Sequence, residues 1–203
     1  MTTMRKLVVA AAATATMIAM PVATETQGEQ LDITAFAVNM SNIATGANNT
    51  INLSVKQWST AEERERLVTA MVEKGPKELL KILSKAPEKG RFWIPTLRGP
   101  DPTNLRLGWT LRYAWQQPLP EGGRRIVLAT DRYIGMQEAR NQPRTIDYPF
   151  TLFEIRVNKD GEGEGKLAYA TKIHFDKEKK IVEIENYSSE PVRLQNVKVK
   201  VKS

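Results

Sequence analysis

The sequence predicts an α+β fold that is mainly antiparallel β, arranged as a sandwich or a partly open barrel of about nine strands. Short segments of alternating apolar and polar residues, separated by turn residues, fill the chain from residue 91 onward. A single helical hairpin is predicted at about residues 60–86, in the N-terminal half. Connections between the predicted strands are short, which favours antiparallel pairing. The pattern leaves sandwich and barrel as alternatives.

The N-terminus has the pattern of a secretory signal peptide. Arg5 and Lys6 precede an apolar run at residues 7–20, which at about 14 residues is shorter than the ~20 that a membrane-spanning helix needs. We predict a signal peptide at residues 1–23 and a single β-rich domain at residues 24–203, with a retained membrane anchor as the alternative. The mature protein is then exported, periplasmic or secreted, without a transmembrane span. Cleavage lowers the formal net charge from +7 by two, to +5, and this mild excess weakly favours anionic partners.

Two strands are expected before the hairpin. Residues 31–40 are apolar on both alternating faces, which favours a central strand, and residues 51–55 alternate as a half-buried strand. In the hairpin, Thr60 and Glu63 have the spacing of a capping box at a helix start. Gly75 is expected to end the first helix and Pro76 to begin the second.

The remaining strands follow from alternation. They are predicted at residues 107–115, with every odd position apolar, and at residues 125–130, 151–157, 166–175 and 181–186. The segment NKDGEGEG is expected to be the turn that pairs residues 151–157 with 166–175. Near Gln195 and Asn196 the apolar positions change from even to odd, which predicts a bulge. The final VKVKVKS predicts a protected edge strand.

Several chemistries have no support in the sequence. There is no cysteine, and the one histidine, His174, is expected on a solvated strand face, so we predict no metal site and no cofactor. A calcium loop starting at Asn158 fails at its twelfth position, which is Tyr169. Phosphate-binding glycine motifs do not occur. We expect no nucleic-acid partner, because an exported protein meets no chromosome.

Two groups of residues are candidates for ligand binding. Trp109, Tyr113 and Trp115 form an aromatic stripe that is either core or the lining of a ligand site. The segment NQPRTIDYPF supplies a candidate binding rim, which consists of Arg140, Arg144, Asp147 and Tyr148. The competing interpretation is structural: its two prolines hold the chain extended as it enters the next strand.

Carboxylates gather in the same region. Asp131, Glu138, Asp147 and Glu154 lie close in sequence, and glycoside hydrolysis needs two carboxylates held several ångströms apart. Surface ion pairs with neighbouring arginines are the simpler interpretation. A carboxylate-based envelope hydrolase therefore stays as the alternative function.

Three segments resemble an uncharacterised family of exported bacterial proteins. They are KQWSTAEERERL, the run from TDRYIGMQEARN to VNKDGEGEGK, and ENYSSEPVRLQNVK. The resemblance implies export and a single domain, and it implies no activity, cofactor or catalytic residue. The sequence thus predicts an exported cell-envelope protein that binds an unknown ligand or protein without catalysis. An assembly subunit that uses an exposed terminal strand is a further hypothesis.

Overall fold

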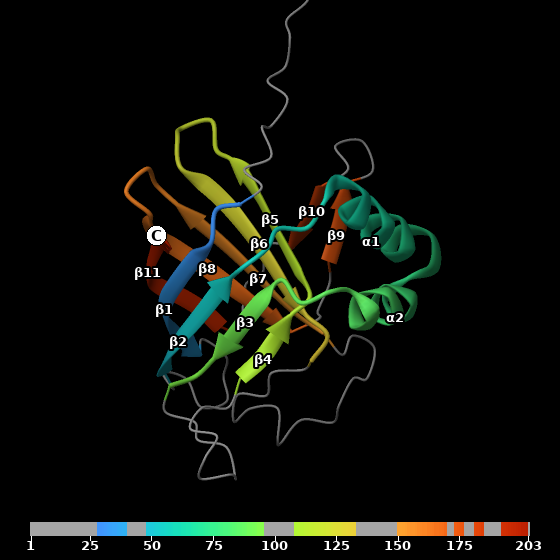
Figure 1. The fold of residues 1–203 in the computed structure, drawn as a ribbon, viewed down its shortest axis with the longest axis horizontal. Coiled ribbons are helices and arrows are strands. Elements are labelled where there is room, and N and C mark those ends of the chain that lie inside the picture. Colours follow the sequence, from blue (N-terminus) through green and yellow to red (C-terminus); the bar gives the residue numbers. More distant parts are fainter. Residues whose placement is uncertain are drawn as a thin grey trace, which may run out of the picture.

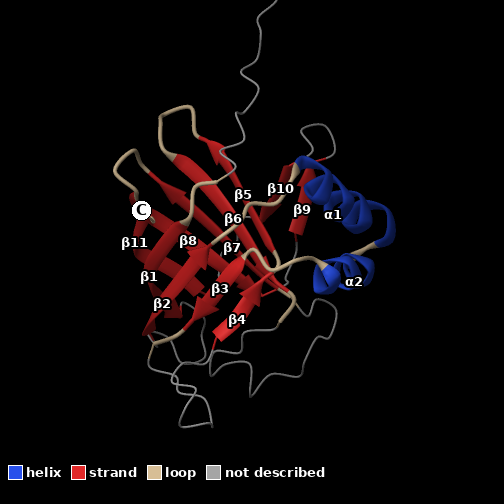
Figure 2. Ribbon diagram, in the orientation of Figure 1, coloured by secondary structure: helices blue, strands red, loops and turns tan. Residues whose placement is uncertain are grey.

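The structure is a computed structural model that describes residues 28–39, 48–95, 108–132, 150–169, 173–176, 181–184 and 192–202. Within these ranges the chain forms two helices and eleven strands (Figure 1 and Figure 2). No helix in them is long and apolar enough to cross a bilayer. The predicted signal peptide, residues 1–23, lies outside the described residues and stays a prediction.

Nine of the described strands form one antiparallel sheet. They are β1 Leu31–Asn39, β2 Asn48–Val55, β3 Gly90–Trp93, β4 Gly108–Leu111, β5 Tyr113–Pro118, β6 Arg124–Thr130, β7 Thr151–Val157, β8 Glu162–Tyr169 and β11 Val192–Val201. Their spatial order is β4-β3-β2-β1-β11-β8-β7-β6-β5. The remaining described strands, β9 Ile173–Asp176 and β10 Ile181–Ile184, form a separate pair.

The sheet curls into a nearly closed barrel. Its two end strands, β4 and β5, are separated in sequence by Arg112 alone, so the first and last strands of the sheet meet at this residue (Figure 1). The backbone N–H of Arg112 donates to the carbonyl of Ala129 on β6 at 2.8 Å. This confirms the predicted β-rich fold and favours the barrel over the sandwich.

The barrel interior is a packed core. Alternation along each strand sends one set of side chains inward, where apolar residues are almost fully buried. Phe92 and Phe153 contact each other with ring centroids 5.1 Å apart. The core comprises Leu31, Ile33, Ala35, Ala37, Ile51, Leu53, Val55, Phe92, Ile94, Leu111, Ala114, Ile126, Leu128, Phe153, Ile155, Val157, Leu167, Val192, Leu194 and Val197.

The helical hairpin lies outside the barrel, on one side of it (Figure 2). Helix α1 is Ala61–Lys74 and α2 is Pro76–Lys85. The predicted capping box is present: the Glu63 backbone donates to Thr60 Oγ1 at 3.2 Å, and the Thr60 backbone donates to Glu63 Oε2 at 2.9 Å. Gly75 joins the helices with φ 79°, a conformation that glycine adopts without strain.

Both ends of the hairpin are fixed to the barrel. Nζ of Lys89, which is buried, lies 2.7 Å from Glu63 Oε2. Burial opposes the charged form of Glu63, but hydrogen bonds from Lys89 and the Thr60 backbone, with the charges of Lys89 and Arg66, outweigh it and hold its pKa below the ordinary value. At the other end, Arg112 Nη1 donates to the carbonyl of Ala86 at 3.0 Å.

The C-terminal strand departs from the prediction of an edge strand. β11 pairs with β1 on one side and with β8 on the other, so it lies inside the sheet. The predicted bulge is confirmed, because the register of β11 shifts between Leu194 and Val197, and Asn196 has φ 49°. This counts against an assembly that pairs through an exposed C-terminal strand.

Two further strand predictions need correction. Residues 166–175 do not form one strand, because β8 starts earlier, at Glu162, and β9 belongs to the second sheet. His174 pairs with Glu183 in that second sheet. β1 is central as predicted, but its outward residues Asp32 and Thr34 are exposed, since the outer face of a barrel wall meets solvent.

Candidate functional site

A second apolar cluster lies outside the barrel, between the hairpin and strands β5, β6 and β7. Because strand residues alternate, β6 sends Ile126 and Leu128 into the barrel and Arg125, Val127 and Ala129 outward. The outward residues align in cross-strand rows. These rows are Tyr113–Ala129–Leu152, Trp115–Val127–Glu154 and Gln117–Arg125–Arg156.

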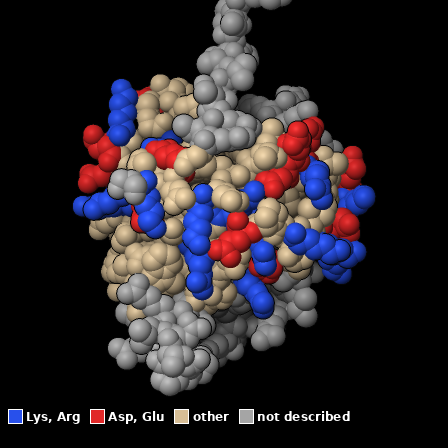
Figure 3. Space-filling view, viewed as in Figure 1, with Lys and Arg blue, Asp and Glu red and all other residues tan. Residues whose placement is uncertain are grey.

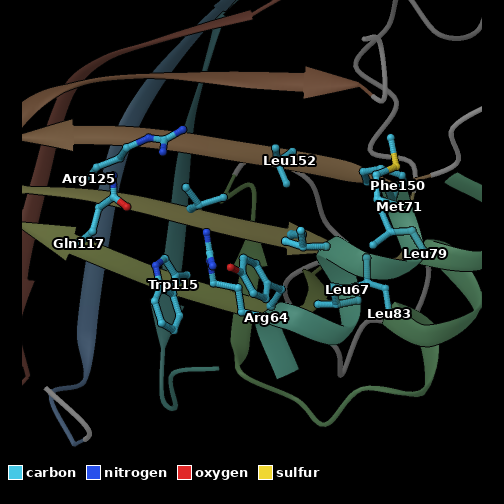
Figure 4. A pocket seen from close by; sticks show the side chains of 14 residues that line it. Arg64, Leu67, Met71, Leu79, Leu83, Trp115, Gln117, Arg125, Phe150 and Leu152 are labelled. Carbon is cyan, nitrogen blue, oxygen red and sulfur yellow. The ribbon is translucent and has the colours of Figure 1, made fainter. Parts of the chain in front are cut away.

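The hairpin covers these rows incompletely and leaves a pocket (Figure 4). Its volume is about 80 Å³. The helices contribute one wall and the strands the other. The described lining consists of Arg64, Leu67, Val68, Met71, Leu79, Leu83, Tyr113, Trp115, Gln117, Arg125, Val127, Ala129, Phe150 and Leu152.

The pocket changes in polarity from one end to the other. Figure 4 shows Leu79, Leu83 and Phe150 grouped at one end. Arg64 and Arg125 lie toward the opposite end, together with Trp115 and Gln117. The described lining contains two arginines and no acidic residue. An occupant would therefore meet apolar side chains at one end and the polar groups of Arg64, Arg125 and Gln117 at the other.

Arg64 of α1 is held against two aromatic residues. Its guanidinium carbon lies 5.3 Å from the ring centroid of Trp115, within the range of a cation–π contact. Arg64 also acts on the phenol of Tyr113, where its charge favours the ionised form. Burial raises the pKa of Tyr113, and the opposing charges of Arg64 and Arg125 do not overcome it, so the phenol stays neutral at pH 7.

Arg125 is held from the neighbouring strand. Its Nε donates to Glu154 Oε1 at 2.7 Å, and both side chains are buried. The exposed Arg156 also contacts Glu154, at 3.3 Å. Glu154 thus contacts two arginines, the buried Arg125 and the exposed Arg156. The pair also fixes Arg125 in place, as a ligand site on rigid strands requires.

A second, polar cavity of about 230 Å³ lies where β4 and β5 meet. The described residues that line it are Gly108, Trp109, Thr110, Arg112, Asp131 and Arg132. Trp109 also stacks on Phe92, with ring centroids 5.2 Å apart. Arg112 Nε and Asp131 Oδ2 are 3.8 Å apart, which is an ion pair but too long for a hydrogen bond. This cavity is separate from the pocket under the hairpin.

The predicted aromatic stripe is thus divided between two places. Trp109 and Leu111 face the barrel core, whereas Tyr113 and Trp115 line the outer pocket. The prediction of one shared face is wrong because the chain bends at Arg112, where β4 ends and β5 begins. Of the predicted rim, Arg140, Arg144, Asp147 and Tyr148 lie outside the described residues.

Sequence reasoning missed most of the pocket, including Arg64 and Arg125. One signal was available: residues 126–129 are apolar at adjacent positions, so both faces of that strand need cover. The amphipathic hairpin was the available cover. Neither signal alone indicates which strand the helices contact.

The described carboxylates do not converge as a hydrolase needs. Glu154 is held by Arg125 at 2.7 Å, whereas Asp131, just beyond the end of β6, is paired with Arg112 at the other end of that strand. Paired glycosidase carboxylates lie about 5–9.5 Å apart. Glu138 and Asp147 lie outside the described residues. Within those residues no group of three or more acids or histidines could hold a metal ion.

The glutamate-rich turn has a structural explanation. Asn158 Oδ1 accepts hydrogen bonds from the backbones of Asp160 at 2.9 Å and Glu162 at 3.0 Å. Gly161, with φ 79°, completes the turn. The side-chain oxygen of Asn158 thus stabilises the hairpin between β7 and β8, as the turn interpretation of this segment predicts.

Comparisons with protein-family models, with curated proteins and with solved structures find no match to this chain. The resemblance to an exported bacterial family therefore stays a prediction. Function has to be argued from the pocket and its residues.

Proposed function

We propose that this protein is an exported, non-enzymatic binding protein that holds a small, partly apolar molecule between its helical hairpin and the outer face of β5, β6 and β7. The observation that carries the proposal is the pocket itself. It combines a mainly apolar lining with a few fixed polar groups, which is the usual composition of a small-molecule site.

The anchoring of the hairpin supports a preformed site. Glu63 with Lys89 fixes the start of α1, and Arg112 with Ala86 fixes the end of α2. Binding then loses little free energy in ordering the pocket walls. On the face shown in Figure 3, acidic and basic side chains are interspersed, so a large patch of one sign on that face is not the basis of the proposal.

The test is native mass spectrometry of the protein purified from its own cells without denaturation. We expect a reproducible extra mass that is lost in Val127→Phe, because Val127 lines the pocket and a larger ring fills it. Val72→Phe is the matched control, since Val72 is exposed on α1 and outside the described lining. A clean mass from wild type, or an equal extra mass in Val127→Phe, contradicts the proposal.

A further inference from the structure

The polar cavity where β4 and β5 meet is larger than the pocket under the hairpin, and the proposed function does not use it. Its volume is about 230 Å³, and the charged residues of its described lining are Arg112, Asp131 and Arg132. A third arginine lies beside this lining, because Nη2 of Arg91 would be 3.5 Å from a Cβ placed on Gly108. Basic groups therefore outnumber acidic ones among the described residues around this cavity.

Arg112 has a hydrogen-bond donor that the described part of the protein leaves unsatisfied. Its Nε is buried and makes no hydrogen bond there. Asp131 Oδ2 lies 3.8 Å away, which is too far to accept this hydrogen. Burying a donor without an acceptor is unfavourable, so a ligand that supplied an acceptor here would gain a hydrogen bond.

Hydrogen bonds hold the two sides of the cavity apart. On one side, Arg112 Nη1 donates to the carbonyl of Ala86 at 3.0 Å. On the other side, the Arg132 backbone N–H donates to Thr130 Oγ1 at 3.3 Å, and the Arg132 carbonyl accepts from Thr151 Oγ1 at 3.1 Å. Both threonines are fully buried. A backbone shift that narrowed the cavity would break these bonds, so the site is preformed.

We infer that this cavity is a second binding site, and that it takes a small oxyanion such as phosphate between Arg112 and Arg132. Guanidinium groups match the geometry of phosphate and carboxylate oxygens, and hydrogen bonds between charged groups are stronger than neutral ones. The volume is several times the ~30 Å³ that one water occupies, so an ion of five heavy atoms fits. Asp131 reduces the attraction for an anion, but two arginines line the cavity with it.

Titration with inorganic phosphate at pH 7, followed by NMR of the backbone amides, tests the inference. The isotope-labelled protein is expressed from the full chain and purified without denaturation, and sodium chloride keeps the ionic strength constant. We expect saturable shifts at the amides of Thr110, Arg112 and Arg132. The absence of saturable shifts at these amides would mean that the cavity holds only water, and it would overturn the inference.

Two variants of the lining should change phosphate binding in opposite directions. Arg132→Gln should weaken it about tenfold, the effect of losing one charged hydrogen bond. Asp131→Asn should strengthen it about fivefold, because it removes the one carboxylate of the described lining. Arg156→Gln is the matched control, since it removes the same charge outside the described lining, where 61% of the side chain is exposed. It should bind phosphate as wild type does.

The variants also give the results that would contradict the inference. Weaker binding in Asp131→Asn would mean that the occupant donates to Asp131, and the oxyanion assignment would be wrong. Equal weakening in Arg132→Gln and Arg156→Gln would show a general effect of charge and no site. Val127→Phe fills the pocket under the hairpin and should leave phosphate binding unchanged, so this inference and the proposed function can fail separately.

The oxyanion could be a free ion or the phosphate of a lipid headgroup. Sedimentation with phosphatidylglycerol vesicles distinguishes these sources. Protein that sediments as wild type but not as Arg132→Gln binds the headgroup in this cavity. Protein that gives the phosphate shifts and does not sediment binds the free ion.

Discussion

The two apolar clusters of this protein lie on opposite faces of the same strands and are enclosed in different ways. The barrel core is surrounded by strands, and Ile126, Leu128 and Phe153 have no exposed surface. The outer cluster has sheet on one side and two short helices on the other. It includes half-buried residues such as Met71 and Val127, and it leaves a pocket.

This difference indicates how the chain separates stability from function. A barrel of this size is filled by its own side chains. A ligand site then has to be built elsewhere, where a smaller element covers the sheet incompletely. The outer face also tolerates charge: Arg125 and Glu154 are buried there as a pair, whereas the buried polar residues at inward positions of β6 and β7, Thr130 and Thr151, are uncharged.

The largest expected effect comes from truncating one large side chain in the barrel core and one in the outer cluster. Phe153→Ala should lower the free energy of unfolding by about 4 kcal/mol, because it leaves a large cavity in a closed core. Leu79→Ala should lower it by about 2 kcal/mol, the low end for leucine, because the residue already borders open space. Urea denaturation measures both. An equal or larger loss at Leu79 would contradict the comparison.

Enlarging two adjacent residues of β6 should again destabilise the barrel side more than the pocket side. Ile126→Phe should lower the free energy of unfolding by about 2 kcal/mol, because it overpacks the barrel. Val127→Phe points into the pocket and should change it by less than about 1 kcal/mol. The same denaturation experiment applies. If Val127→Phe destabilises as strongly as Ile126→Phe, the outer pocket has no room for a ring.

Loss of the capping box at Thr60 should destabilise the helical hairpin and leave the barrel unaffected. Thr60→Ala removes the acceptor for the Glu63 backbone and should lower the free energy of unfolding by about 1 kcal/mol. Thr69→Ala, at an exposed position of the same helix, is the control and should not destabilise. Hydrogen exchange of the α1 amides should be faster in Thr60→Ala than in wild type. The amides of β7 should exchange at the wild-type rate. Uniform acceleration in β7 would contradict a local effect.

The smallest expected effect is the pH dependence of the hairpin anchor. The pKa of Glu63 is lower in the folded protein, so its contribution is complete above its ordinary value of 4.5 and is lost as the pH falls through the lowered pKa. The difference in free energy of unfolding between wild type and Glu63→Gln should therefore shrink from about pH 6 to about pH 3. Glu62→Gln, exposed in the same turn, controls for charge. A difference that grows on acidification would contradict a lowered pKa of Glu63 in the folded protein.

Local patterns predicted the local structure well. The capping box at Thr60, the glycine joint at Gly75, and the bulge beside Asn196 are all present. Each depends on residues within a few positions of one another. The bounds of β7 also match the prediction, because alternation over residues 151–157 is uninterrupted.

Features that depend on distant partners were not predictable from patterns. Gly163 and Gly165 suggested a turn, but they lie within β8, where the backbone of β7 approaches closely. A Cβ on Gly165 would lie 2.6 Å from the carbonyl oxygen of Glu154. The lysines of VKVKVKS suggested an edge, yet in a barrel every strand has a solvated outer face. Alternating lysines therefore do not identify an edge strand.

The candidate site was predicted only in part for the same reason. Tyr113 and Trp115 were identified as ligand candidates, and they line the pocket. The wall formed by Arg64 and the hairpin leucines could be assigned only once α1 and α2 were placed against β6. Sequence periodicity shows that the helices have an apolar face, but it does not show which surface that face covers.

A crystal structure under xenon pressure tests the central claim most directly, since xenon enters dry apolar cavities. The account predicts a xenon atom beside Leu79, Leu83 and Phe150, and none among the barrel-core residues around Phe153. Xenon inside the barrel, or a hairpin closed on the sheet with no xenon beneath it, would contradict the claim that the ligand site lies on the outer face.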